Sequence, residues 1–142
     1  MNALTKLLVL ALGYSSSSAF AEVLGGPIFN AATGHAYFIL TANTWTNSEA
    51  EAMRLGGHLV TINDAAEQDW IYSTFSRYAG EWKNLWIGLT DAASEGTFYW
   101  ASGEPVTFSY WDQGEPKNSG GTEHYAELTY TRLRQWNDAP NS

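Results

Sequence analysis

Residues 85–90 read LWIGLT, and this run does more than any other stretch to decide the fold. Its aromatic and aliphatic residues favour a strand. Two aromatic runs follow, FYW at 98–100 and YW at 110–111, each with a glycine after it, at 103 and 114. The pattern closes with WND at 136–138. Residues 102–122, which lie between, are rich in Gly, Pro and polar side chains. A loop of that length in a compact domain usually carries function or is disordered, so we expect a core strand, a long loop and a late strand.

Oxygen donors gather in the second half of the chain at spacings that a hard cation such as Ca²⁺ needs. Ca²⁺ takes about six to eight oxygens, mostly from carboxylates and carbonyls. The candidates are three carboxylates and two amides: Glu115, Glu123, Asp138, Asn118 and Asn137. Pro116 permits a cis peptide bond, which would aim its neighbours at one point. The alternative is an ordinary solvated surface loop, the commoner fate of acid-and-amide segments.

The full ordered series resembles the C-type lectin-like domain, whose signature includes a WIGL core strand, an EPN or QPD loop and a WND strand. This chain has WIGL at 86–89, EPK at 115–117 and WND at 136–138. The resemblance runs from about Gly34 to Ser142. It implies an α+β fold in which two short helices flank small antiparallel sheets and a long loop binds the ligand.

The same resemblance implies a primary Ca²⁺ and sugar site, in which each retained ligand also hydrogen-bonds a sugar hydroxyl. By position its residues are Glu115, Lys117, Glu123, Asn137 and Asp138. Glu115 keeps the first half of EPN, the mannose- and glucose-type pattern, rather than the galactose-type QPD. Lys117 departs from it, because an ammonium only donates and cannot replace an amide carbonyl at a cation. Two interpretations stay open: Asn118 substitutes as a ligand, or the loop keeps its shape without tight Ca²⁺ binding.

A second cation site is implied by acids after WIGL and by the segment after EPK. Asp91, Glu95 and Asn118 match it by position, while His124 stands where an Asp is usual. The alternative is that Asp91 and Glu95 only cap turns.

Charge and motif content exclude several other functions. A net charge of −8 argues against nucleic acid, whose phosphates need Lys and Arg. The chain has no Cys and no nucleophile-elbow, zinc-protease or phosphate-loop motif. Glu115 and Glu123 could in principle act on a glycosidic bond, but carboxylates bound to a metal are poor general acids. We therefore expect a binding protein and no enzyme.

The first 21 residues have the pattern of a secretory leader rather than of a fold element. Lys6 gives a short positive segment and Leu7–Leu12 an apolar one, and Ser15–Ser18 lead into an A-x-A-like cleavage site, AFA, at 19–21. The apolar run is too short for a membrane-spanning helix. We predict a signal peptide at 1–21, a domain at 22–142, and export to a secreted, periplasmic or cell-surface location. Export without any cysteine favours a bacterial over an animal source.

The pattern also predicts helices at Glu49–Leu55 and after Asp64, which with Glu67 forms a capping box. Members of the resembled family continue past WND into a final strand that pairs with the first strand, here Tyr37–Leu40, and no such strand is apparent in this chain. We therefore expect a truncated form, or a strand completed by another chain, so that an oligomer is possible. The alternative is that Val23–Phe29 folds back over this edge.

Taken together, the residues and the resemblance predict an exported carbohydrate-binding lectin domain that depends on Ca²⁺, with a glycan of the mannose or glucose type as partner. The alternative, from a different class, is a Ca²⁺-independent protein-interaction or adhesion module on the same fold, because resemblance of fold does not settle the ligand.

Overall fold

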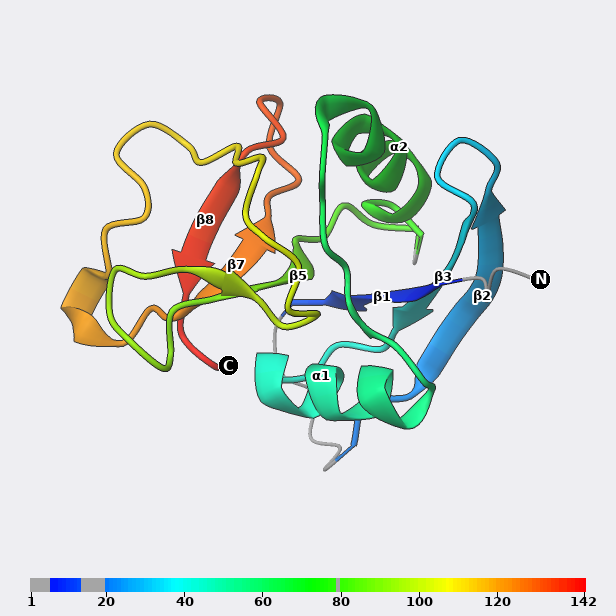
Figure 1. Ribbon diagram of the computed structural model, residues 1–142, viewed down its shortest axis with the longest axis horizontal. Coiled ribbons are helices and arrows are strands. Elements are labelled where there is room, and N and C mark those ends of the chain that lie inside the picture. Colours follow the sequence, from blue (N-terminus) through cyan, green and yellow to red (C-terminus); the bar gives the residue numbers. More distant parts are fainter. Residues whose placement is uncertain (1–5, 14–19, 79) are drawn as a thin grey trace.

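The computed structural model describes residues 6–13, 20–78 and 80–142. In chain order the elements are β1 (Leu7–Leu12), β2 (Val23–Asn30), β3 (His35–Leu40), α1 (Trp45–Arg54), β4 (His58–Leu59), α2 (Ala65–Phe75), β5 (Leu85–Thr90), β6 (Tyr99–Trp100), the 3₁₀ turn η1 (Ser119–Gly121), β7 (Tyr125–Leu128) and β8 (Trp136–Ala139). Figure 1 shows α1 and α2 on opposite sides of β1 and β3, with β7 and β8 at the far end from β2. The expected α+β fold with two short helices is confirmed.

The strands form one sheet in the order β2-β3-β1-β5-β7-β8, with β4 paired to β1 and β6 paired to β5. Strand β1 is parallel to β3 and β4, and the other pairings are antiparallel. The sequence predicted separate small sheets. They are joined here because β1 lies between β3 of one half and β5 of the other.

Strand β5 is the LWIGLT run, and all six of its residues are buried. Gly88 is required by a close backbone approach, since a Cβ at this position would lie 2.5 Å from the carbonyl oxygen of Leu59. Its N–H donates to the Val60 carbonyl over 2.8 Å, and its own carbonyl accepts from Ala101 N–H over 2.7 Å. The glycine therefore lets three segments pack backbone to backbone at the centre of the domain.

Both helices begin at a capping side chain. The Thr44 hydroxyl accepts from Asn47 N–H, so α1 starts at Trp45, four residues before the predicted start. The Asp64 carboxylate accepts from Glu67 N–H over 2.8 Å, and the Glu67 carboxylate accepts from Asn63 N–H over 3.0 Å. This is the predicted capping box, except that the return bond comes from Asn63 rather than from Asp64 itself. Neither helix is long and apolar enough to cross a membrane.

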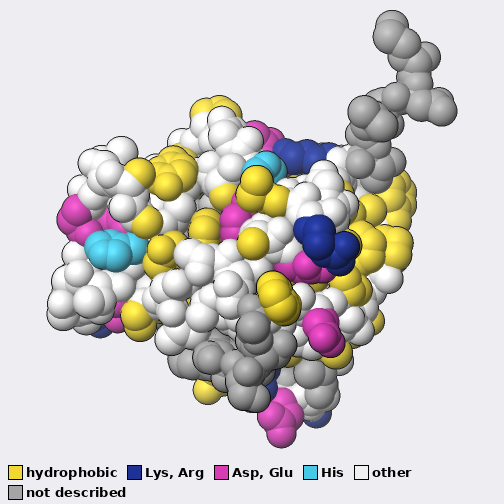
Figure 2. Space-filling model, turned by 90° about the horizontal axis from the view of Figure 1, so that it is seen from below, with side chains coloured by type: hydrophobic (Ala, Val, Ile, Leu, Met, Phe, Trp, Pro, Cys, Tyr) yellow, Lys and Arg dark blue, Asp and Glu magenta, His cyan; other side chains and the backbone are white. Residues whose placement is uncertain are grey.

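The core has one cluster on each face of the sheet. The larger cluster, on the α2 side, includes Leu10, Ile39, Phe75, Ile87 and Trp136, and the smaller, on the α1 side, includes Val9, Leu40, Trp45, Leu59 and Trp86. Figure 2 shows the molecule from below, with apolar side chains at the end that carries β2 and at scattered places elsewhere, and acidic side chains distributed over the face, some of them beside a histidine at the opposite end.

Strand β1 falls within the stretch expected to be a leader, and it lies inside the sheet. The edge that we expected to be open at Tyr37–Leu40 is not open here, because β3 has β1 on one side and β2 on the other. The alternative, in which Val23–Phe29 folds back onto β3, matches strand β2. Cleavage as a leader stays a prediction, and Ser15–Ser18 and Ala19 lie outside the described residues.

Candidate ligand-binding site

The long loop between β6 and β7 is tied to β8 at its midpoint. Asp112 N–H donates to the Trp136 carbonyl over 2.9 Å, and Trp136 N–H donates to the Tyr110 carbonyl over 2.7 Å. The Trp136 indole is completely buried, makes edge-to-face contacts with Trp100 and Trp111, and donates to Gln68 Oε1 over 2.9 Å. The loop is therefore clamped to the core just before the EPK segment.

Asp138 fixes the shape of that segment. Its carboxylate is buried and accepts two backbone N–H groups, from Lys117 over 3.2 Å and from Asn118 over 2.7 Å. Hydrogen bonds to a charged acceptor are among the stronger ones in proteins. Asn118 has a left-handed backbone with φ of 49°, and the Glu115–Pro116 bond is cis. The turn is thus held by a carboxylate from a core strand.

Glu115 and Lys117 flank the proline and pair with each other. Lys117 Nζ donates to Glu115 Oε1 over 2.8 Å. This hydrogen bond, with the charge of Glu115, raises the pKa of Lys117 above its usual value, and Glu123 and Asp138 add smaller contributions in the same direction. The Glu115 side chain is only 10% exposed, and its Oε2 is buried without a hydrogen-bond partner. One carboxylate oxygen is therefore available to a donor or cation.

Glu123 and Asn118 are used by their own turn. Glu123 Oε2 accepts from Ser119 N–H over 2.6 Å, and Asn118 Oδ1 accepts from Glu123 N–H over 3.0 Å. Glu123 Oε2 or Asn118 Oδ1 could bind a cation only by giving up its hydrogen bond to the backbone N–H.

Asn137 points away from the loop. Its amide donates to Glu127 Oε1 over 3.2 Å, and Glu127 also accepts from the Asn84 amide over 2.9 Å. Successive residues of a strand face opposite sides of the sheet, so Asn137 and Asp138 of β8 are separated. The structure thus gathers Glu115, Lys117 and Asp138 about one turn, leaves Glu123 at its far end, and does not bring in Asn137.

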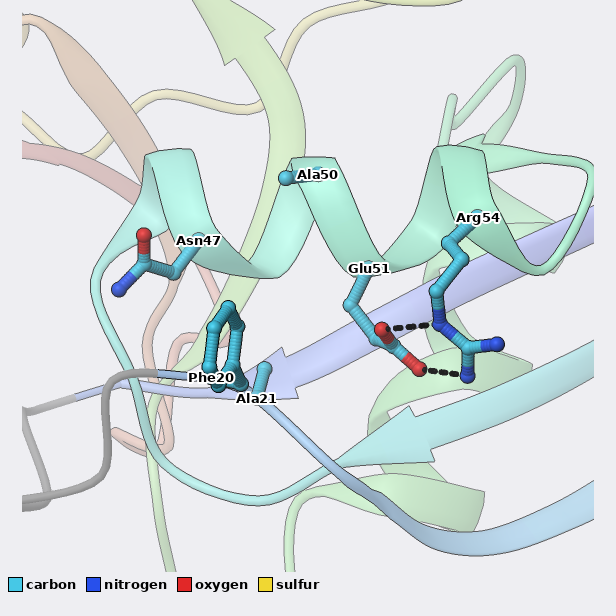
Figure 3. A pocket seen from close by; sticks show the side chains of 6 residues that line it. All are labelled: Phe20, Ala21, Asn47, Ala50, Glu51 and Arg54. Atoms are coloured by element: carbon cyan, nitrogen blue, oxygen red, sulfur yellow. Dashed lines mark hydrogen bonds and ion pairs between the residues drawn. The ribbon is translucent and has the colours of Figure 1, made fainter.

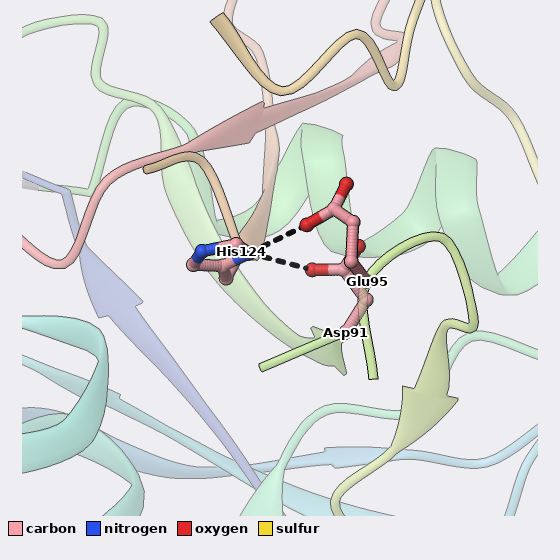
Figure 4. A group of neighbouring side chains, drawn as sticks. All are labelled: Asp91, Glu95 and His124. Atoms are coloured by element: carbon pink, nitrogen blue, oxygen red, sulfur yellow. Dashed lines mark hydrogen bonds and ion pairs between the residues drawn. The ribbon is translucent and has the colours of Figure 1, made fainter. Parts of the chain in front are cut away.

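The second predicted group does come together, with His124 as a member (Figure 4). His124 Nδ1 lies 3.1 Å from Asp91 Oδ1 and 3.2 Å from Glu95 Oε2. Candidate ligand atoms of these three residues lie within 4.8 Å of one another. An ionised carboxylate only accepts, so the tautomer with a proton on Nδ1 would donate to these oxygens. Asp91 also caps its own turn by accepting from Gly96 N–H over 2.8 Å, as the alternative interpretation expected.

Strand pairing explains why these three residues meet. Asp91 and Glu95 follow β5, and His124 precedes β7, which is antiparallel to β5 with Thr90 opposite Tyr125. The motif position indicated His124 at this site in place of the usual Asp, and its contacts with Asp91 and Glu95 make it a member of the group. A hollow of about 130 Å³ is lined by residues of both the Glu115–Asn118 turn and the segment with Asp91 and Glu95. Its lining residues are Asp91, Glu95, Gly96, Phe98, Pro116, Lys117, Asn118 and Asp138.

A larger hollow, of about 250 Å³, lies beneath α1 and lacks such a set of ligands. Phe20 and Ala21 lie under the helix there, with Asn47 and the ion pair of Glu51 and Arg54 around them (Figure 3). Its only acid is already bonded to Arg54 through both carboxylate oxygens. The chemistry expected of the site therefore belongs to the smaller hollow.

Comparison with known proteins identifies the class. The family model for the lectin C-type domain matches residues 41–142, and the chain belongs to this family. It is 34% identical over 110 residues to C-type lectin domain family 4 member K of Mus musculus, covering 73% of this chain and 31% of that protein. It is 34% identical over 95 residues to the galactose-specific lectin nattectin of Thalassophryne nattereri, covering 67% and 59%. The chain thus spans less than two thirds of the length of either relative.

Solved structures agree with the family. The C-type lectin CEL-I from Cucumaria echinata superposes with a TM-score of 0.66 at 30% identity, covering 70% of this chain and 76% of that one. A calcium-independent type II antifreeze protein superposes with a TM-score of 0.61 at 26% identity, covering 69% and 70%. The lectin C-type domain family is non-enzymatic, which confirms the expectation that this domain is not an enzyme.

Proposed function

We propose that the chain is an exported carbohydrate-binding domain in which a glycan contacts the Glu115–Asn118 turn and the adjoining hollow, with Ca²⁺ as the cofactor. The observation that carries the proposal is the buried Asp138 carboxylate on the amides of Lys117 and Asn118. It holds the turn in shape in the absence of a ligand, and preformed sites lose less free energy to ordering when they bind.

The buried and unpaired Glu115 Oε2 is an acceptor that lacks a donor and supports a cation at the turn, while among the described residues the acid and histidine group whose ligand atoms already lie within 4.8 Å of one another is Asp91, Glu95 and His124. In this proposal Glu115, Glu123, Asp138 and Asn118 hold the ion, and Asn137 joins them only after turning from Glu127. Asp91, Glu95, Asn118 and His124 form the second candidate site. Bound Ca²⁺ would supply a Lewis-acidic centre for sugar hydroxyls, while the carboxylates accept from those hydroxyls and Lys117 offers a donor.

The kind of sugar is part of the proposal. Glu115 keeps the first residue of the pattern for mannose- and glucose-type glycans, which supports that class. Nattectin, a relative, is described as galactose-specific, so both classes belong in the test.

Binding of the labelled chain to mannose-, glucose- and galactose-type glycans tests the proposal, in millimolar Ca²⁺ and in excess chelator. We expect binding to mannose- or glucose-type glycans that is lost in chelator and weakened at least tenfold by Glu115→Gln. Glu51→Gln is the matched control, because Glu51 lies at the other hollow with Arg54. Failure to bind any glycan in Ca²⁺ would overturn the proposal.

A second candidate is a Ca²⁺-independent interaction or adhesion module. The observation in its favour is Lys117 Nζ, which supplies Glu115 with a cation from the chain itself. In the same experiment this function predicts binding, to a glycan or to a protein, that chelator leaves unchanged.

A further inference from the structure

Strand β1 is an interior strand of the sheet although it lies in the predicted leader. It pairs with β3 in parallel over five positions, from Leu7 opposite Ala36 to Ala11 opposite Leu40. On its other side, Ala11 and Leu12 pair with β5. The side chains of residues 8–12 are buried, with at most 7% exposed.

The surroundings of β1 are shaped to receive a strand. Val60 N–H donates to the Val9 carbonyl over 2.7 Å, and Ala36 N–H donates to the Lys6 carbonyl over 3.1 Å. Gly57 leaves room for the backbone, since a Cβ there would lie 2.3 Å from the Leu7 carbonyl oxygen. Without β1, the domain would show an apolar groove bordered by unpaired backbone groups, which is a template for strand addition.

Ala21 and Glu22, on either side of the predicted cleavage point, are also part of the fold. Ala21 is 3% exposed and lies beneath α1 (Figure 3). Glu22 N–H donates to Thr41 Oγ1 over 3.0 Å, and its carbonyl accepts from Thr41 N–H over 2.8 Å. A protease needs this backbone extended and accessible, so folding protects the bond between Ala21 and Glu22. Insertion of β1 and removal of a leader are therefore alternatives for the same segment.

We propose that the groove between β3 and β5 is a strand-acceptor site that binds an apolar strand without needing its covalent link to β2. The intact chain fills the groove with Leu7–Leu12, and a chain cut after these residues binds the same segment as a separate peptide of residues 6–13. The alternation selects the occupant: Leu8, Leu10 and Leu12 enter the α2-side cluster, while the smaller Val9 and Ala11 face α1.

The test begins with the intact chain, carrying a protease recognition sequence inserted between Gly13 and Phe20. The chain is folded and then cut. We expect the N-terminal fragment to stay with the domain in native size-exclusion chromatography, to leave in denaturant, and to exchange with a fluorescent peptide of residues 6–13. A Leu10→Asp peptide should bind at least tenfold more weakly. Release of the fragment on cutting, whether the domain then stays folded or aggregates, would overturn the proposal.

A disulfide provides an independent test of register, since the chain has no cysteine of its own. Ala11 and Leu40 are opposite each other on the α1 face, so the double variant Ala11→Cys, Leu40→Cys should oxidise to one intramolecular bond. Once cut, this variant should no longer exchange with the labelled peptide. The matched control, Ala11→Cys with Ile39→Cys, places the thiols on opposite faces and should not cross-link. Equal cross-linking of both pairs would refute the assigned strand.

Discussion

At the scale of single residues, Lys117 and a metal ion would compete for the same oxygen of Glu115. The ammonium lies 2.8 Å from Glu115 Oε1 and also interacts electrostatically with Glu123 and Asp138. Glu115, Glu123 and Asp138, three of the proposed Ca²⁺ ligands, thus already have the Lys117 ammonium near them. The remaining ligand capacity is concentrated in the unpaired Glu115 Oε2.

Lys117→Asn should therefore strengthen Ca²⁺ binding. The change removes a like charge from the ion's neighbourhood and supplies a neutral carbonyl, and ligand charge and geometry tune Ca²⁺ affinity widely. We expect a gain of about tenfold, or ~1.4 kcal/mol, measured by calorimetry. Lys83→Asn is the control, because Lys83 forms an exposed pair with Glu81 elsewhere. Equal or weaker binding by Lys117→Asn would show that the shape of the turn limits affinity.

Glu127→Gln should flatten the dependence of stability on pH. Burial raises the pKa of Glu127 above its usual value, although the amides of Asn137 and Asn84 oppose this shift. The folded state therefore holds the proton more readily than the unfolded state, and the contribution to stability is lost as pH rises through the raised pKa. Glutamine keeps an acceptor for both amides without the charge, so the variant should be more stable at neutral pH.

Urea unfolding between pH 4 and pH 8 checks this expectation (about the range over which a raised carboxyl pKa acts). Glu81→Gln is the control, since the Glu81 side chain is 77% exposed. If Glu127→Gln lost stability at neutral pH, the charged form would be the one that the fold requires.

Residue-level sequence reasoning recovered part of the candidate site. Motif positions gave Lys117, Asn118, Asp138, Asp91 and Glu95, which line one hollow, and Glu115, which pairs with Lys117. They did not give the direction of Asn137, because a motif is linear and strand alternation sends its neighbours to opposite faces. They placed His124 where an Asp is usual but did not predict its contacts, which depend on the pairing of β5 with β7.

At the scale of elements, β5 is a strand whose packing tolerates little change. Gly88→Ala should destabilise the domain, because the added Cβ would lie 2.5 Å from the backbone oxygen of Leu59, which cannot rotate away. Overpacking of this kind costs about 1–3 kcal/mol. Gly13→Ala is the control, since its Cβ would meet its nearest atoms at an ordinary 3.5 Å. Comparable free energies of unfolding for the two variants would contradict the expected close approach.

The predicted helices and strands agree with the structure where the sequence holds a complete local signal. The sequence could not decide where one pattern is typical of two different segments. The Asp64 cap gave the start of α2, whereas α1 begins after the Thr44 cap, four residues before the predicted Glu49. The LWIGLT strand and the order of the later strands also agreed. Leu7–Leu12 is different, because a short apolar run is typical both of a leader and of a buried strand. Only the position between β3 and β5 distinguishes the two, and that position is set by residues far away in the sequence.

At the scale of the whole molecule, Ca²⁺ should raise the thermal midpoint. A ligand that binds only the native state adds stability by mass action, about 2.7 kcal/mol at a hundred times its dissociation constant. For a chain of 142 residues, this corresponds to a shift of roughly 5–10 °C. Differential scanning calorimetry in millimolar Ca²⁺, in Mg²⁺ and in chelator measures it. An unchanged midpoint in Ca²⁺ would remove calcium from the proposed function.

The clamp between Trp111 and Trp136 has a consequence for how such a domain can change over time. It isolates the tip of the loop, where residues 119–122 are exposed, from the aromatic core that keeps the domain folded. Substitutions at the tip are therefore free of the packing constraints that govern β5 and β8. The scaffold can accumulate new recognition sequences at low risk to folding as long as Gly120 and Gly121, which have positive φ, are kept, and this makes Ser119 and Thr122 suitable positions to randomise in a display library.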